Sequence, residues 1–163
     1  VEVINIDILN FNLKKFKDLI IVSNLPYNVG TKIILNLLNY NKNISEMIFM
    51  IQKEVAIKFD YNLPKMNKYK FITKIISNYV RCFDVSSNVF TPKPKINSTV
   101  VKFTLNKNIS DLNKAKCFSN LIFKNMRKKI NNNINIKDKN YNLLNKRVNE
   151  LTIEQLLKIY YFF

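Results

Sequence analysis

The sequence contains no histidine and only one glycine, Gly30. Without histidine, the chain cannot form a histidine-based catalytic triad, a histidine general base or the usual zinc sites, and we expect no metal site. A loop that cradles phosphates, or a dinucleotide-binding fingerprint, needs several glycines. Neither can be built from these residues, so these classes of nucleotide-binding protein are excluded for this stretch of sequence.

Cysteine and long apolar segments are also scarce. Two cysteines, Cys82 and Cys117, are too few for a disulfide framework, and we predict that both are small buried residues in a reducing compartment. No segment resembles a signal peptide, and no apolar run approaches the length that spans a membrane. We therefore expect a cytoplasmic protein without a membrane partner. An organelle matrix is the alternative compartment.

The charge is strongly unbalanced. The chain has 27 Lys and Arg against 11 Asp and Glu, a formal net charge of +16. This excess favours a polyanionic partner, because each cation placed on a phosphate releases condensed counterions. A solvated basic surface and AT-rich codons, which enrich Lys, Asn, Ile and Tyr, explain part of the same bias. Charge alone therefore favours a nucleic-acid partner only slightly.

Five short apolar runs have the composition of strands. They are residues 1–6, ending at Asp7, then 19–22, 46–52, 80–85 and 99–105. The run 19–22 (LIIV) is typical of a strand buried on both faces, and the last two runs flank the loop 86–98 as an antiparallel pair. Residues 11–17 form a polar connection with room for one helical turn.

Helical patterns alternate with these runs. The first predicts a helix capped by Thr31, with apolar residues at positions 33, 34, 37 and 38. The others predict helices at residues 52–59, 71–79, 112–130 and 152–163. Alternating strands and helices predict an α/β fold. With 47% apolar residues, the 163-residue chain has room for one packed domain and a small appendage, which we place at residues 1–106 and 107–163.

The residues best suited to chemistry are Asn24, Leu25, Pro26 and Tyr27, directly after the second strand. Ligands of open α/β sheets bind beyond the carboxyl ends of the strands. The Asn24 side-chain carbonyl and the backbone carbonyl of Leu25 or Pro26 could grip the hydrogens of an adenine amine, and Tyr27 could stack on the base. An ordinary strand-to-helix turn is the alternative, since Asn and Pro are common there.

Three further segments follow in order: MIQKEVA (residues 50–56), VFTPKPKINSTVV (89–101) and MRKKI (126–130). With SNLPYN (23–28), they resemble motifs of the ribosomal RNA adenine N6-dimethyltransferases, including the signature F-x-P-x-P-K-V-x-S-x-V-V with Ile96 in place of Val. The resemblance implies a Rossmann-like methyltransferase sheet, of which this chain is the C-terminal portion, followed by a small helical RNA-binding domain. It implies S-adenosylmethionine as cofactor.

The resemblance also assigns roles to residues. Asp7 matches the acid that binds the cofactor's adenine amine, Asn24 the catalytic Asn between cofactor and target amine, and Tyr27 the residue that stacks on the target base. Phe90 matches the aromatic residue on the opposite face of that base. Pro92 and Pro94 would stiffen the loop that presents Phe90, and Lys95 is a candidate phosphate contact.

The basic residues Arg127, Lys128 and Lys129 would face RNA phosphate in the first helix of the C-terminal domain, although a solvated helix face is the simpler interpretation for each alone. The implied partner is small-subunit ribosomal RNA within an immature small ribosomal subunit. We expect the protein to act as a monomer.

The sequence also departs from the family. The Gln-Asn-Phe-Leu segment, the glycine-rich cofactor loop and the acid that grips the ribose all precede the position of Val1 in that family. Together with the absence of an initiator Met, this indicates a fragment that binds S-adenosylmethionine weakly or not at all and is inactive alone. Ser86 and Ser87 replace the family's usual prolines, which loosens the loop.

Three alternatives remain open from sequence. The branch that dimethylates large-subunit RNA and confers macrolide resistance shares much of this site, although Leu25 and the QKEVA and MRKK segments favour the small-subunit branch. DNA adenine and release-factor glutamine methyltransferases share an Asn-Pro-Pro-Tyr-like motif but not the Phe90 loop. A ribosome assembly or transcription factor that binds RNA on the same scaffold, without catalysis, belongs to another functional class.

Overall fold

The computed structural model describes residues 1–92, 94–109, 112–136 and 142–163. The chain divides into two compact units. The first contains residues 1–57 and 76–109, and the second contains residues 58–75 and 110–163. Each unit is described by itself, and the predicted domain boundary at residue 106 stays a prediction.

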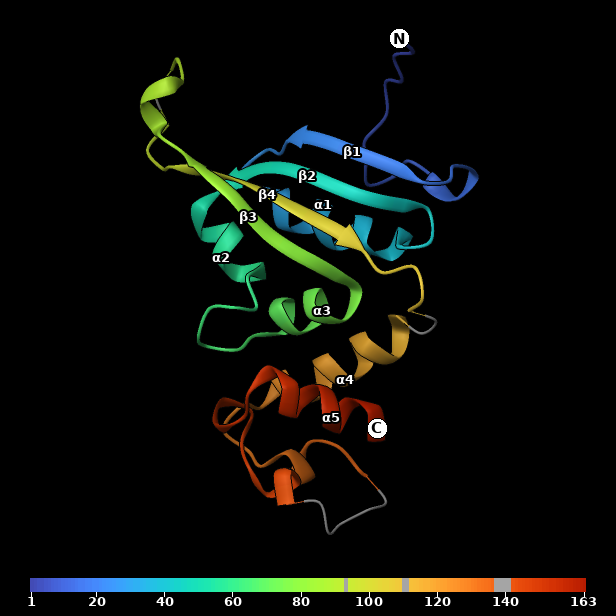
Figure 1. The fold of residues 1–163 in the computed structure, drawn as a ribbon, viewed down its shortest axis with the longest axis vertical. Coiled ribbons are helices and arrows are strands. Elements are labelled where there is room, and N and C mark those ends of the chain that lie inside the picture. Colours follow the sequence, from blue (N-terminus) through green and yellow to red (C-terminus); the bar gives the residue numbers. More distant parts are fainter. Residues whose placement is uncertain (93, 110–111, 137–141) are drawn as a thin grey trace. The chain divides into compact units, whose positions relative to one another are not determined.

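The first unit is built on a sheet of four strands in the order β1-β2-β4-β3 (Figure 1). The strands are β1 (Leu19–Asn24), β2 (Ile44–Gln52), β3 (Ser77–Val85) and β4 (Ser98–Leu105). β1 and β2 are parallel, with Asn24 opposite Met50 at the carboxyl end, whereas β4 is antiparallel to both β2 and β3. The antiparallel pair that the sequence predicted is therefore confirmed, and β4 inserts between β2 and β3.

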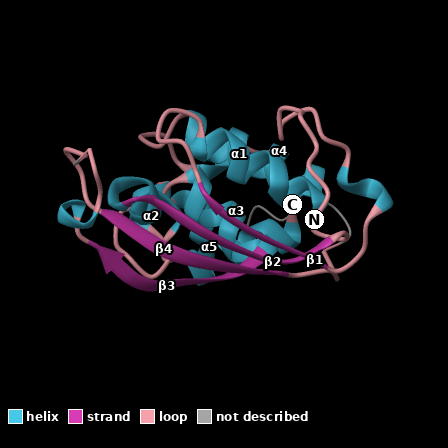
Figure 2. Ribbon diagram, turned by 90° about the horizontal axis from the view of Figure 1, so that it is seen from above, coloured by secondary structure: helices cyan, strands magenta, loops and turns pink. Residues whose placement is uncertain are grey.

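One face of this sheet carries the core of the unit. Met47, Phe49 and Ile51 alternate along β2 and are buried, as are Val101 and Phe103 on β4. Helices α1 (Gly30–Leu37) and α2 (Lys53–Phe59) lie on one side of the sheet, as Figure 2 shows. The buried side chains that alternate along the strands and the apolar face of α1 therefore pack together in a single core layer.

The opposite face is more exposed, which corrects one prediction. On β1, Ile20 and Val22 are 62% and 70% exposed. The run 19–22 does form a strand, but it is not buried on both faces within the described residues. β1 is also an edge strand, since β2 is its only described neighbour.

Two more predictions for the first 31 residues were wrong. Residues 1–6 do not form a strand, because no described strand lies beside them to satisfy their backbone N–H and C=O groups. Helix α1 begins at Gly30 with Val29 as its N-cap, so Thr31 lies inside the helix and does not cap it. The predicted helical turn is present as a 3₁₀ helix at Leu13–Lys15.

The second unit is helical. It contains most of α3 (Lys68–Ile76), α4 (Leu112–Lys124) and α5 (Ile153–Phe162), with 3₁₀ turns at Ile130–Asn132, Asn142–Asn145 and Val148–Glu150. Phe71, Phe118 and Tyr160, one from each helix, form an aromatic cluster with ring centroids 5.3–5.9 Å apart. Thr152 caps α5 by accepting a hydrogen bond from the Gln155 N–H.

The structure shifts one predicted helix and shortens another: α3 lies at Lys68–Ile76 and not at 71–79, and α4 is shorter than predicted. α3 ends at Ile76, so Tyr79 belongs to strand β3, where its hydroxyl donates to the Ala56 carbonyl at 2.8 Å. α4 ends at Lys124, so residues 126–130 follow the helix in a turn whose Lys128 N–H donates to the Asn125 carbonyl. Lys129 instead forms an isolated bridge with Arg147.

Both cysteines are exposed, so the prediction that they are small buried residues was wrong. Cys82 lies on the edge strand β3 and Cys117 on the outer face of α4. Among the described residues, no cluster of His, Cys, Asp or Glu could hold a metal ion. No described helix has both the length and the apolar character needed to cross a membrane.

Candidate active site

Backbone hydrogen bonds to β2 and to the start of α1 fix the turn that follows β1. The Leu25 N–H donates to the Met50 carbonyl of β2 at 3.1 Å, which extends the parallel pairing by one residue, and the Leu25 side chain is buried. The Pro26 carbonyl accepts hydrogen bonds from Val29 and Gly30 at the start of α1, at 3.3 and 2.9 Å. Since the Pro26 carbonyl is thus engaged, the Leu25 carbonyl is the better of the two predicted backbone acceptors.

Tyr27 is held by a second element. Its hydroxyl lies 3.1 Å from Ser98 Oγ at the start of β4, where Ser98 itself is almost completely buried. Tyr27 as a whole residue nevertheless remains 40% exposed. An exposed aromatic side chain that is anchored only at its hydroxyl end offers a face to a flat ligand such as a base.

The loop between β3 and β4 approaches the same turn. Ser86 caps the 3₁₀ turn Ser87–Val89 through the Asn88 N–H, and the Ser87 N–H donates to Asn97 Oδ1 at 3.1 Å. These bonds close the base of the loop and present the half-buried Phe90. Ser86 and Ser87, which the sequence predicts to loosen this loop, are therefore both hydrogen-bonded.

The turn and the loop line one cavity of about 460 Å³. Its lining residues are Asn24, Leu25, Pro26, Tyr27, Phe90, Thr91, Pro92 and Pro94. All four residues of the predicted catalytic motif and the predicted opposite aromatic residue thus meet at one site. Two segments more than 60 residues apart in sequence form the cavity, at the carboxyl end of β1.

A charged cluster braces the ends of β3 and β4 beside this loop. Asp84 accepts hydrogen bonds from Lys53 at 2.7 Å and Thr99 at 2.7 Å, and its carboxylate lies 3.3 Å from the Arg81 guanidinium. The Lys53 N–H donates in turn to the Asn97 carbonyl. The Lys53 and Thr99 hydrogen bonds lower the pKa of Asp84 from 3.8 to about 2, against an opposing effect of burial.

The lowered pKa predicts an acid-sensitive contribution to stability. Because the folded state binds the Asp84 proton less tightly than the unfolded state, this contribution is present above about pH 4 and is lost as the pH falls toward 2. Chemical denaturation of the wild type and of Asp84→Asn should therefore give free energies of unfolding that differ at pH 7 and converge near pH 2. A difference that is independent of pH would contradict this role for the Asp84 charge.

The remaining predicted residues lie elsewhere. Asp7 is exposed and accepts the Leu9 N–H at 2.9 Å, so it caps a turn and does not line the cavity. Lys95 is exposed in the β3–β4 loop, outside the lining residues. Arg127, Lys128 and Lys129 are exposed in the second unit.

Sequence reasoning missed the residues that support the site. Ser98 and Thr99 lie within the family-like segment 89–101, but the sequence predicts no role for them, nor for Asp84 or Lys53. Their roles depend on the β3–β4 register, which pairs Asp84 with Thr99. An acid 15 residues before a Thr is not a local sequence signal, so no motif search would have joined them.

The fold is that of Rossmann-like methyltransferases. It is similar to a dimethyladenosine transferase from Plasmodium falciparum, with a TM-score of 0.78 and 17% identity, over 97% of this chain and 70% of that one. It is equally similar to the 23S rRNA methyltransferase ErmE, with a TM-score of 0.78 and 17% identity, over 98% of this chain and 70% of that one. These similarities bear on the fold class, which is confirmed.

The chain belongs to the ribosomal RNA adenine dimethylase family, whose model matches residues 1–163. It is 41% identical over 147 residues to ribosomal RNA small subunit methyltransferase A of Malacoplasma penetrans, covering 86% of this chain and 52% of the relative. It is 32% identical over 151 residues to the protein of the same name from Hydrogenobaculum, covering 91% of this chain and 59% of that relative. The chain therefore spans between half and three fifths of the length of these relatives, and the predicted family is confirmed.

Proposed function

We propose that these residues form the target-base half of an enzyme that transfers methyl groups from S-adenosylmethionine to the N6 amine of adenines in small-subunit ribosomal RNA, giving N6,N6-dimethyladenosine. The observation that carries the proposal is the single cavity that joins Asn24, Leu25, Pro26 and Tyr27 to Phe90. Family membership and the small-subunit names of the relatives support the choice of reaction and substrate.

The chemistry follows from the acceptors at the cavity. The lone pair of an adenine amine is delocalised into the ring, which makes the amine a poor nucleophile. In the first transfer Asn24 Oδ1 and the Leu25 carbonyl each accept one amine hydrogen, and in the second transfer one of them accepts the hydrogen that remains. Acceptors held at fixed positions favour a tetrahedral nitrogen with a localised lone pair. Fixed orientation of the amine supplies the rest of the catalysis. The methylated, positively charged N6 is strongly acidic and loses its proton to water, so no general base with an unusual pKa is required.

The aromatic residues hold the base. Tyr27 stacks on one face of the adenine and Phe90 covers the other, since both side chains line the cavity from different segments. The base must leave its helix to reach them, because both faces of a stacked base are covered by its neighbours. The Ser98 hydrogen bond holds the hydroxyl end of Tyr27, and the Asp84 cluster braces the strand ends that flank the Phe90 loop.

The residues present fit only part of the cofactor's site. S-adenosylmethionine supplies an electrophilic methyl group when bound, and Asn24 stands where such a group would meet the amine. Asp7, however, caps a turn outside the cavity, and the only glycine, Gly30, packs at the start of α1. The described residues therefore provide one wall of a cofactor site and not the whole site.

This partial fit predicts the behaviour of the 163 residues by themselves. Isothermal titration of the isolated chain with S-adenosylmethionine should give no saturable heat up to a ligand concentration of about 1 mM, because a binding free energy stronger than about −4 kcal/mol needs contacts that these residues lack. Saturation at micromolar ligand would show that this stretch holds a complete cofactor site.

The proposal is tested by methyl transfer to separated ribosomal subunits. The complete protein is incubated with labelled S-adenosylmethionine and with immature small or large subunits, and incorporation into each RNA is counted. Label in small-subunit RNA alone supports the proposal. Label in large-subunit RNA alone would assign the macrolide-resistance reaction, and salt-sensitive RNA binding without incorporation would assign an RNA-binding factor that lacks catalysis.

A further inference from the structure

The second unit contains a cavity of about 970 Å³ that the proposed reaction does not use. It is lined by residues 61–66, by Lys74 of α3, by Met126 after α4, and by Asn149 and residues 151–154 around the start of α5. All of these residues belong to the second unit, so the cavity lies within one compact body. Its volume is within the range of ligand-binding pockets, and it is larger than the target-base cavity.

The wall formed by residues 61–66 is held rigidly. Lys70 is 2% exposed, and its ammonium donates to the carbonyls of Leu63 and Pro64 at 2.8 and 2.7 Å. Asp60 Oδ1 accepts the Asn62 N–H at 3.1 Å, a local bond at the start of the loop. A buried lysine whose donors bind loop carbonyls fixes the backbone of the wall before any ligand arrives, which lowers the entropic cost of binding.

The chemistry of the lining suits a nucleotide. The side-chain amides of Asn62 and Asn149 each offer a donor and an acceptor, and no described residue is hydrogen-bonded to either. Met66 and Met126 are half-buried beside the buried Leu151 and Ile153, and together they give an apolar surface for the flat face of a base.

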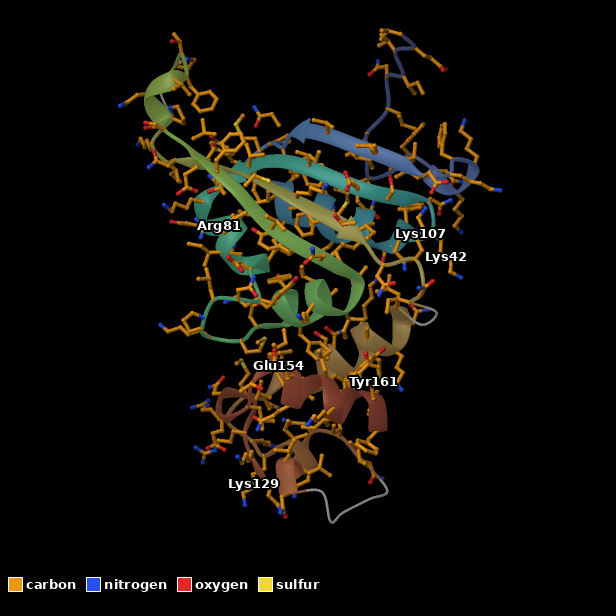
Figure 3. All side chains as sticks on the ribbon, in the orientation of Figure 1. Lys42, Arg81, Lys107, Lys129, Glu154 and Tyr161 are labelled. Carbon is orange, nitrogen blue, oxygen red and sulfur yellow. The ribbon has the colours of Figure 1, made fainter. Side chains whose placement is uncertain are left out.

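The charges indicate where a phosphate would lie. Lys65 is exposed and has no ion-pair partner among the described residues, whereas the Lys74 ammonium lies 4.6 Å from the centre of the Tyr61 ring. Glu154, labelled in Figure 3, is the only acid of the lining, and the hydrogen bond from its own backbone N–H lowers its pKa and keeps it negative. A phosphate is therefore favoured near Lys65 and disfavoured near Glu154.

The positive charge of the second unit favours a polyanion such as RNA as the molecule that carries this nucleotide. The sequence of residues 58–75 and 110–163 contains 16 Lys and Arg but five Asp and Glu, whereas the rest of the chain has 11 and six. The long-range field of the second unit thus attracts RNA more strongly than that of the first. A base that is paired in a helix cannot enter a concave pocket, so the ligand must be unpaired.

We propose that this cavity binds one unpaired nucleotide of the RNA substrate, with Asn62 and Asn149 on the base edge and Lys65 on the phosphate. The proposal rests on RNA being the substrate of the target-base site, but it concerns a second contact. This contact holds the RNA without taking part in methyl transfer. Its consequence is a preference for RNA with an exposed single-stranded nucleotide in addition to the target adenines.

The test measures binding of the complete protein to an RNA hairpin with an unpaired loop and to a fully paired duplex of the same length. The double variant Asn62→Ala/Asn149→Ala should weaken hairpin binding at least about tenfold, as the loss of two hydrogen bonds implies, and leave duplex binding unchanged. Lys65→Ala should lower the slope of log affinity against log salt concentration by about one.

The control is Asn113→Ala/Asn120→Ala, which removes two exposed asparagines of α4 that do not line the cavity. It should bind both RNAs as the wild type does. An equal loss of affinity for hairpin and duplex in the Asn62/Asn149 variant, or no loss for either, would overturn the proposal. Methyl transfer is counted in the same preparations. Unchanged binding with normal transfer rejects only this cavity, whereas absent transfer in the wild type rejects the proposed function.

Discussion

Replacement of Asn24 by Ala should lower the single-turnover rate of methyl transfer by about 10²–10³-fold, the usual effect of removing one fixed group that stabilises developing charge. Asn24 ends β1 opposite Met50 and lines the target-base cavity. In the proposed reaction its side-chain oxygen accepts a hydrogen of the amine. The affinity for RNA should hardly change, because the stacking residues and the basic residues of the second unit remain.

The matched control for this variant is Asn28→Ala. Asn28 is an exposed asparagine of the same turn and does not line the cavity, so its loss should leave the rate within about twofold of the wild type. Equal rates for the two variants would mean that the Asn24 side chain has no special part in the reaction. A parallel loss of RNA affinity in Asn24→Ala would assign it to binding instead.

Replacement of Tyr27 by Ala should reduce kcat/KM by about 10–100-fold, since base stacking on an aromatic side chain contributes about 1–3 kcal/mol. Tyr27 is 40% exposed, which leaves its ring accessible to a base, and its hydroxyl is hydrogen-bonded to Ser98. Steady-state kinetics with a small-subunit substrate measure this effect.

Two variants separate stacking from anchoring at this position. Tyr27→Phe keeps the ring and loses the hydrogen bond to Ser98, so its kcat/KM should fall by less than about tenfold. Ser98→Ala removes the other partner and should match Tyr27→Phe. If Tyr27→Phe were as defective as Tyr27→Ala, the hydroxyl group and not the ring would be the functional part of Tyr27.

Much of this architecture could be predicted because its signals are local. The apolar alternation of β2, the helix spacing within α1 and the turn residues after β1 each depend on neighbours within a few positions. The resemblance to family motifs also predicted that Phe90 lies near this turn, and no local pattern in the sequence contains that information. The cavity brings these segments together, although the individual roles of Asn24, Tyr27 and Phe90 stay predictions.

The wrong predictions concern residues whose structure depends on pairing with segments distant in the sequence. Residues 1–6 have a strand-like composition, but a strand needs a neighbour, and composition does not reveal whether one is present. Tyr79 continues the apolar pattern of α3, yet it lies in β3 because pairing with Phe103 of β4 outweighs helix periodicity. The Asp84 cluster could not be predicted for the same reason, since the register of two strands creates it.

The most direct test of the central claim is the identity of the product nucleoside. Small-subunit RNA is treated with the complete protein and S-adenosylmethionine, digested to nucleosides and analysed by mass spectrometry, in parallel with Asn24→Ala. The account predicts N6,N6-dimethyladenosine with the wild type and little or none with the variant. Methylation at another base or another atom of adenine, or equal amounts of N6,N6-dimethyladenosine from both proteins, would contradict it.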